Sequence, residues 1–64
     1  MAGRTMNITH KGMSILVKER QDDSCVLQFE RHSEDSDKKF PAACRYALTW
    51  LLANAGDMRG DYER

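Results

Sequence analysis

The chain has 64 residues, and its ten lysine and arginine residues are balanced by ten acidic ones. A chain of this length has room for one domain with one small core, because it buries only about 60% of its unfolded surface on folding. The balanced charge excludes a long-range field that would steer the protein toward nucleic acid or an anionic membrane. Small cores give small stabilities, so help from a partner is also expected.

The first half of the chain alternates apolar and polar residues with the period of a strand. We predict strands over residues 5–10 and 13–20, joined by the dipeptide Lys11-Gly12, since glycine tolerates the positive φ of a two-residue hairpin turn. This turn sets the apolar residues of both strands on one face of the sheet. The predicted pairs are His10 with Met13, Ile8 with Ile15, and Met6 with Val17.

A third strand is predicted over residues 24–31, after a turn in the Asp- and Ser-rich stretch "RQDDS". Cys25, Leu27 and Phe29 share its apolar face. Two registers keep that face apolar: Ile15 and Val17 lie against Cys25 and Leu27, or against Leu27 and Phe29. The continuous apolar run 15–17 suits a central strand, so we predict a three-stranded antiparallel meander in the order 1-2-3.

The stretch "HSEDSDKK" is too polar to pack, and we predict an exposed acidic loop over residues 32–37. A helix is predicted over residues 38–55, with Pro41 in its first turn and Gly56 as a cap at its end. The residues 57–64 are predicted to be a frayed tail. The whole chain, 1–64, is therefore expected to be a single α+β domain with a βββα order.

The predicted helix carries two apolar stripes. One should close the core on the sheet: Phe40, Cys44, Ala47, Leu48, Leu51, Leu52 and Ala55. On the opposite side Tyr46 and Trp50 stand four residues apart and therefore lie side by side. The residues around this pair are Ala42, Ala43, Arg45, Thr49 and Ala53.

Tyr46 and Trp50 have two interpretations. Either Trp50 folds over an edge of the sheet or is covered by Met58 and Tyr62, or the pair anchors an interface, as Trp and Tyr often do. We favour the interface, formed with a partner protein or in a homodimer. The second stripe, with the seven residues named above, is thus the predicted partner-binding site.

The chain contains none of the common catalytic motifs: no glycine-rich phosphate loop, no nucleophile elbow and no helical His-Glu pair. We therefore expect no enzyme activity and no cofactor. Cys25, Cys44, His10 and His32 lack the short spacing of zinc ligands, so no metal site is predicted. We favour reduced core thiols for the two cysteines, and a disulfide between sheet and helix is the alternative in an oxidising compartment.

No stretch approaches the length of an apolar membrane span, and the first residues lack the apolar segment of a signal peptide. We expect a cytoplasmic protein without a membrane partner.

Lys38 and Lys39 stand at the start of the predicted helix, and Ala42 and Ala43 follow them. Three strands followed by such a helix resemble the second half of a double-stranded-RNA-binding domain and the three-stranded DNA-reading modules of phage integrases. The resemblance implies phosphate contacts from Lys38 and Lys39, and Arg45 is the third residue of this alternative nucleic-acid site. Pro41 stands where the RNA-binding motif has a third basic residue, and that family's first helix is missing.

Taken together, the sequence predicts a small non-enzymatic protein-interaction module, a regulator or inhibitor that binds a partner through the outer helix face. Its size is typical of small phage or prophage proteins that block a host protein. A nucleic-acid-binding module that uses Lys38 and Lys39 is the alternative, although acidic residues beside this pair disfavour phosphate binding.

Overall fold

The computed structural model describes the backbone of residues 3–63 and the side chains of residues 3–54. Within the described backbone, four strands and not the predicted three form one antiparallel sheet in the order β1-β2-β3-β4, and one helix follows them. The elements are β1 (Thr5–His10), β2 (Met13–Glu19), β3 (Cys25–Gln28), β4 (Ser33–Ser36) and α1 (Phe40–Glu63). The predicted α+β class, an antiparallel sheet followed by a C-terminal helix, is confirmed.

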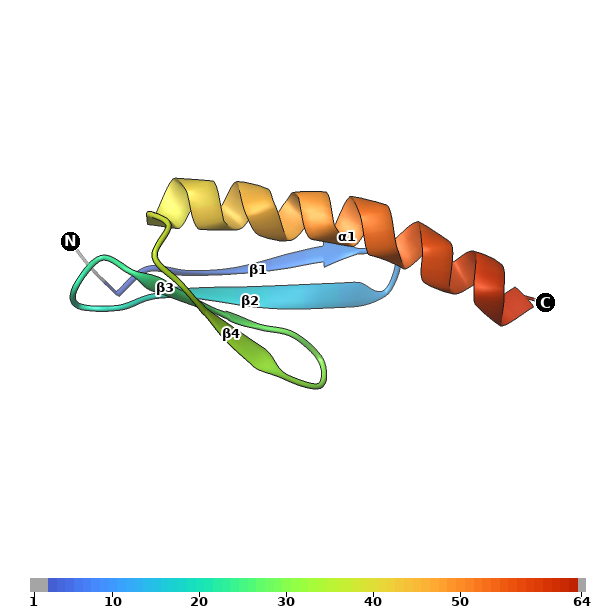
Figure 1. Cartoon of the computed structure of the whole chain (residues 1–64), viewed down its shortest axis with the longest axis horizontal. Helices are drawn as coiled ribbons and strands as arrows, with labels where there is room; N and C mark the ends of the chain where they lie inside the picture. The colour runs from blue at the N-terminus through green and yellow to red at the C-terminus, as the bar shows by residue number, and fades with distance from the viewer. Residues whose placement is uncertain (1–2, 64) are drawn as a thin grey trace.

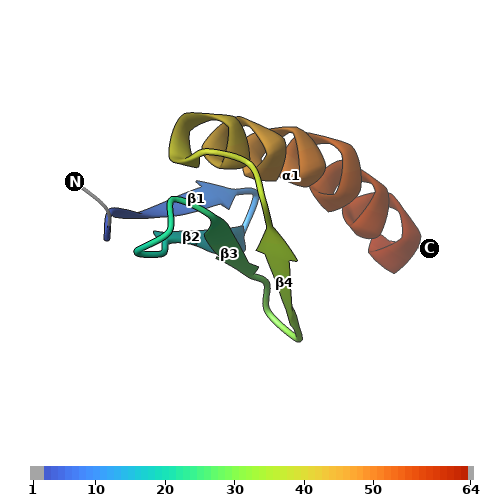
Figure 2. The same ribbon diagram turned by 60° about the vertical axis from the view of Figure 1, so that its left-hand side comes forward.

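The helix covers one face of the sheet unevenly. It lies along the sheet, and its C-terminal part extends past the end of the strands (Figure 1). In a second view it lies above β1 and β2, whereas β4 slants away from it (Figure 2). One long flank of α1 therefore lies on the side of β3 and β4, and the other flank lies on the side of β1 (Figure 2).

The first hairpin has the predicted register. His10 pairs with Met13, Ile8 with Ile15, and Met6 with Val17. Both turn residues have a positive φ, 52° at Lys11 and 83° at Gly12. This combination is the one that a type I′ hairpin turn requires, and it matches the twist of the flanking strands.

We expect Gly12→Ala to lower the free energy of unfolding by about 1 kcal/mol, because an alanine Cβ disfavours a positive φ. Apart from the neighbouring residues in the chain, no residue has an atom within 4 Å of the position that this Cβ would take, so the cost comes from the backbone conformation. Gly12→Asn is the control, because asparagine tolerates this conformation. Urea denaturation of the three proteins checks the prediction, and an alanine variant as stable as the parent would contradict it.

Of the two registers left open for β2 and β3, the structure has the second. Val17 pairs with Leu27 and Glu19 with Cys25. Cys25 and Leu27 are fully buried against the helix, which confirms the predicted apolar face.

The prediction of a loop over residues 32–37 was wrong, because Ser33–Ser36 forms the edge strand β4. The predicted third strand is correspondingly shorter and ends at Gln28. Beyond it Phe29 donates a backbone hydrogen bond of 2.8 Å to the carbonyl of His32, which closes the turn between β3 and β4. An edge strand of this kind is held by backbone pairing, so its side chains show no apolar alternation.

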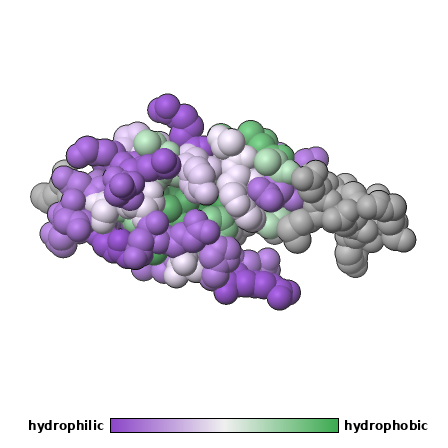
Figure 3. Space-filling model, in the orientation of Figure 1, coloured by the Kyte–Doolittle hydropathy of each residue, from purple (hydrophilic) through white to green (hydrophobic). Residues whose placement is uncertain are grey.

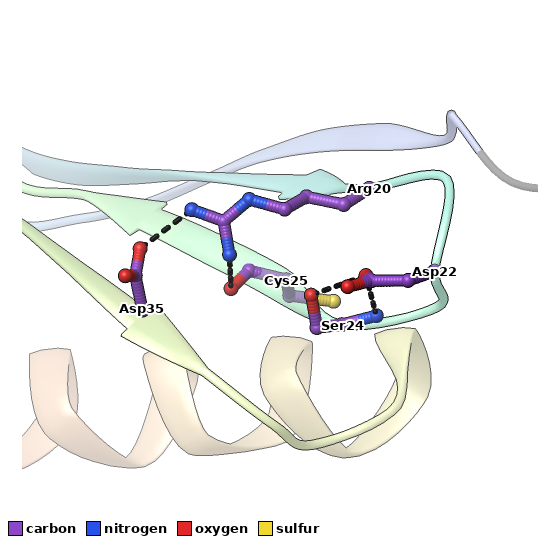
Figure 4. Close-up of polar contacts among 5 residues, drawn as sticks. All are labelled: Arg20, Asp22, Ser24, Cys25 and Asp35. Carbon is purple, nitrogen blue, oxygen red and sulfur yellow. Dashed lines mark hydrogen bonds and ion pairs between the residues drawn. The ribbon is translucent and has the colours of Figure 1, made fainter.

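Arg20 ties β4 to the loop between β2 and β3. Its guanidinium donates to the carboxylate of Asp35 at 2.5 Å and to the carbonyl of Cys25 at 3.4 Å (Figure 4). In the same loop Asp22 accepts hydrogen bonds from the backbone and hydroxyl of Ser24 at 3.0 and 2.6 Å. Both side chains of the Arg20 ion pair are exposed, so it contributes little free energy.

The helix also differs from its predicted bounds of 38–55. It begins at Phe40, after Lys38 donates its backbone N–H to the Ser36 hydroxyl at 3.2 Å. It ends at Glu63, so Gly56 lies inside it and the predicted tail 57–64 is helical as far as Glu63. A glycine inside a helix costs only about 1 kcal/mol relative to alanine, which does not by itself end a helix.

The core lies between α1 and the helix-facing side of β2 and β3. Its buried members are Ile15, Val17, Cys25, Leu27, Phe40, Ala43, Ala47 and Leu51. The helix thus meets the sheet through two alanines and one leucine in its middle. Small side chains at these positions let the helix axis approach the strands closely, and larger side chains are left for its flanks.

Candidate partner-binding site

The helix is rotated relative to the predicted core stripe. Ala43, assigned to the partner-binding stripe, is completely buried. Leu48 and Leu52, assigned to the core, are 42% and 56% exposed. Both assignments were therefore wrong, and Ala55 lies outside the residues whose side chains are described.

The predicted outer stripe required Trp50 to be exposed to solvent, but the structure does not expose it fully. It is partly buried and packs against the core. Its ring meets that of Phe29 edge to face, with centroids 4.9 Å apart and planes at 67°. Phe29 in turn stacks on His32 at 4.5 Å with nearly parallel planes. The alternative in which Trp50 folds against the sheet is therefore the one that its ring contacts support; Met58 and Tyr62 lie outside the described side chains.

The three rings leave an open hollow beside Trp50. Its volume is about 170 Å³, enough for one bulky apolar side chain of another molecule. The lining residues are Met13, Ser14, Phe29, Glu30, Arg31, His32 and Trp50. The wall is mainly apolar, and the charged members come from the β3–β4 turn.

Tyr46 continues this surface one helical turn before Trp50. Its side chain is 40% exposed, and the Lys38 ammonium lies 5.7 Å from its ring centroid. It borders two shallow depressions. One is lined with Leu27 and residues 34–38, and the other with Lys38, Ala42, Arg45 and Thr49.

The structure therefore brings together most of the predicted site. Ala42, Arg45, Tyr46 and Thr49 share one depression, and Ala53 is exposed further along the helix. Phe29 and His32 were missed, because their strand-end positions gave no sign that the chain would turn there and stack them. We call Phe29, His32, Tyr46 and Trp50 the aromatic flank.

On the sheet side the rim of the aromatic flank carries more acidic than basic residues, since Arg31 and Lys38 stand among several carboxylates there. Glu30, Glu34 and Asp37 are exposed there, and Glu34 lies 3.1 Å from His32 Nε2. In the part of the molecule seen in Figure 3, hydrophilic surface surrounds a hydrophobic area between the helix and the sheet. A complementary ligand would present an apolar group flanked by positive charge.

Lys38 and Lys39, the residues of the nucleic-acid alternative, are exposed and precede the first helical residue. Lys38 stands over the Tyr46 ring, and its depression also contains Glu34 and Asp35. These carboxylates oppose a phosphate at the same place. Arg45 is exposed near Lys38 in the second depression.

The cysteines are both free thiols: Cys25 is buried and Cys44 partly buried. Burial raises the pKa of the Cys25 thiol and of the Cys44 thiol. Both therefore stay protonated at neutral pH, which disfavours nucleophilic chemistry.

Arg4 and Glu19 form the best-defined ion pair among the described side chains. The guanidinium contacts both carboxylate oxygens at 3.1 Å, the Arg4 backbone N–H donates to the same carboxylate at 3.2 Å, and the Glu19 side chain is only 6% exposed. The Arg4 guanidinium also lies over the Phe40 ring, 4.6 Å from its centroid. These contacts join the start of β1 to the end of β2 and to the start of α1.

Hydrogen bonds from Arg4 hold the pKa of Glu19 below its ordinary value of 4.5. A carboxylate with a lowered folded pKa stabilises the protein fully above its unfolded pKa, and this contribution is lost as the pH falls through the folded pKa. We therefore expect Glu19→Gln to be less stable than the parent at pH 7, and the difference to shrink below pH 4.5. Thermal unfolding from neutral to acidic pH checks this, and a difference that stays constant with pH would contradict it.

Two further features are absent from the residues that the structure describes. No group of three or more His, Cys, Asp or Glu side chains there is arranged to hold a metal ion. Nor does that part of the chain contain a helix long and apolar enough to cross a membrane. Comparison with known proteins gave no match to a family model, to a curated protein or to a solved structure.

Proposed function

We propose that this chain is a small non-enzymatic protein-interaction module that regulates or inhibits a partner protein by docking it against the aromatic flank. The observation that carries the proposal is the open hollow beside Trp50, continued by the 40% exposed ring of Tyr46. Aromatic side chains at such places dominate binding energies, because they remove a large apolar area from water at a small entropic cost. An apolar area left open in a small domain is commonly an interaction site.

The charge around the flank suggests the chemistry of the partner. Glu30, Glu34 and Asp37 border it on the sheet side, where they outnumber Arg31 and Lys38. A partner segment with one bulky apolar residue and adjacent Lys or Arg residues fits both the hollow and its rim. Such charges mainly raise the association rate and orient the encounter.

Affinity capture from the native host tests this proposal, with three forms of the chain as bait. We expect one protein to bind the parent chain, to be lost with Tyr46→Ser, and to be retained with Leu52→Ser. The two substituted side chains are exposed to similar extents on different sides of the helix, so Leu52→Ser is the matched control. Equal capture by all three baits would refute docking at the aromatic flank.

The nucleic-acid alternative is tested on the same proteins. We expect no salt-sensitive retention of the parent chain on double-stranded RNA or DNA at low salt. Retention that falls in the double variant Lys38→Ala/Lys39→Ala would favour the alternative and count against a protein partner.

A further inference from the structure

The two edges of the sheet are built differently. β4 is four residues long, and two of these are Glu34 and Asp35, which discourage pairing with another strand. β1 is six residues long, reads "TMNITH", and contains no Asp, Glu, Lys, Arg or Pro. Charge, proline and shortness are the usual protections of an edge, and β1 has none of them.

The pairing of β1 with β2 determines which N–H and C=O groups of β1 point toward the free edge of the sheet. Glu19 donates its backbone N–H to the carbonyl of Arg4 at 2.8 Å, so Arg4 belongs to a hydrogen-bonded pair. Such pairs alternate along an antiparallel ladder. The N–H and C=O groups of Thr5, Asn7 and Thr9 therefore point away from β2, toward the free edge.

Three exposed apolar side chains accompany this edge. Met6 of β1 is 49% exposed, although it lies on the helix-facing side of the sheet, opposite Val17. Leu48 and Leu52 project from α1 about 160° round the helix from Trp50, at about 100° per residue. Trp50 faces β3, so both leucines lie on the β1 side. We call Met6, Leu48 and Leu52 the edge patch.

We propose that a second copy of this chain occupies this edge, with the two β1 strands paired antiparallel about a two-fold axis at Asn7. This register sets Thr5 opposite Thr9 of the second copy and Met6 opposite Ile8 of the second copy. Like faces then meet: the apolar pair lies on the helix side, and the threonine pair lies on the solvent side. The three residues that face the edge in each copy meet their counterparts and hydrogen-bond as a regular ladder.

The position of the helix fits the same arrangement. Neighbouring strands lie about 4.8 Å apart, so the two-fold axis runs about 2.4 Å outside β1. The helix lies above β1 and β2 (Figure 2). With its axis over the space between these two strands, it would lie about 5 Å from the two-fold axis. The two helices would then be about 10 Å apart, the usual distance of packed helices. Leu48 and Leu52 would fill the space between them.

Charge does not oppose this contact. The register sets Arg4 opposite His10 of the second copy, but Arg4 is already paired with Glu19 of its own chain. The contact is about 20 Å long and consists of one layer of paired β1 strands and one layer of helices. Its buried area is therefore at the low end of the range for specific interfaces. A reversible dimer with a dissociation constant on the order of 10–100 μM is therefore expected.

Sedimentation equilibrium on the full chain, from about 10 μM to about 1 mM, tests the proposal. The mass of the parent chain should rise from 7.4 kDa toward twice that value. Leu48→Glu should weaken the dimer at least tenfold, because two carboxylates would meet near the axis, whereas Thr49→Glu, exposed on another side of the helix, is the control. Circular dichroism confirms that each variant is folded.

A second pair of variants tests the strand contact. Asn7→Pro removes an N–H that faces the free edge without removing a bond to β2, and it should weaken the dimer as Leu48→Glu does. Its control is Ser33→Pro, on the opposite edge of the sheet. A mass that stays at 7.4 kDa throughout, or a dimer that survives both Leu48→Glu and Asn7→Pro, would overturn the proposal. Tyr46→Ser should leave the dimer intact, which separates this proposal from partner docking at the aromatic flank.

Discussion

Leu51→Ala is expected to lower the free energy of unfolding by about 3 kcal/mol. Leu51 is completely buried in the middle of the contact between α1 and the sheet, and its removal leaves a cavity that the small core has little means to fill. A chain of 64 residues has a total stability of roughly 3–10 kcal/mol. At the lower end of this range, this single change leaves a large unfolded fraction at room temperature.

The next residue supplies the control. Leu52 is 56% exposed, and Leu52→Ala should change the free energy of unfolding by less than about 0.5 kcal/mol. Urea denaturation, followed by circular dichroism at a concentration where the chain is monomeric, gives both values. Equal losses of unfolding free energy in the two variants would mean that a different side of the helix faces the sheet.

Trp50→Ala has the second largest expected effect, a loss of about 2 kcal/mol. Its ring packs against the core and meets Phe29 edge to face at 4.9 Å, but one side borders the open hollow, so the loss stays below that of a fully buried ring. Trp50→Phe should recover part of the loss, since it keeps an aromatic contact with Phe29. Tyr46→Ala should cost less than about 0.5 kcal/mol, because that ring is 40% exposed.

Thermal unfolding of these three variants checks the assignment of structural and binding roles. A Trp50→Ala variant as stable as the parent would show that Trp50 does not pack against the core. It would then support the sequence-based prediction that Trp50 lies on an exposed stripe of the helix. A Tyr46→Ala variant as unstable as Trp50→Ala would remove Tyr46 from the partner-binding site and make it part of the core.

The first hairpin could be predicted in detail because two independent signals agreed. Lys11-Gly12 set the register, and the apolar residues Ile8, Ile15 and Val17 then fell on one face. The register of β3 stayed open by one two-residue step, since Cys25 and Phe29 are both apolar and either could face the same partner. β4 could not be predicted, because an exposed edge strand is defined by its backbone pairing, and its side-chain pattern gives no sign of that pairing.

The helix could be placed, but its rotation could not. By hydropathy, Leu48 and Leu52 are better candidates for core residues than Ala43. In the structure, however, Ala43 is buried and both leucines are exposed. Close approach of a helix to a sheet favours small side chains at the centre of the contact, and an apolar pattern alone does not measure this distance. The same rotation turns Trp50 toward Phe29 and creates the hollow that the sequence did not suggest.

The central claim is that the aromatic flank docks a partner protein, and its most direct test maps the contact on this chain. Amide and indole NMR signals would be recorded while the protein captured by the parent chain is added. We expect the largest shifts at Tyr46, Thr49 and the Trp50 indole, and small shifts at Leu48 and Leu52. Shifts centred on those leucines, or on the outer sheet face around Leu16, with Trp50 unchanged, would contradict it.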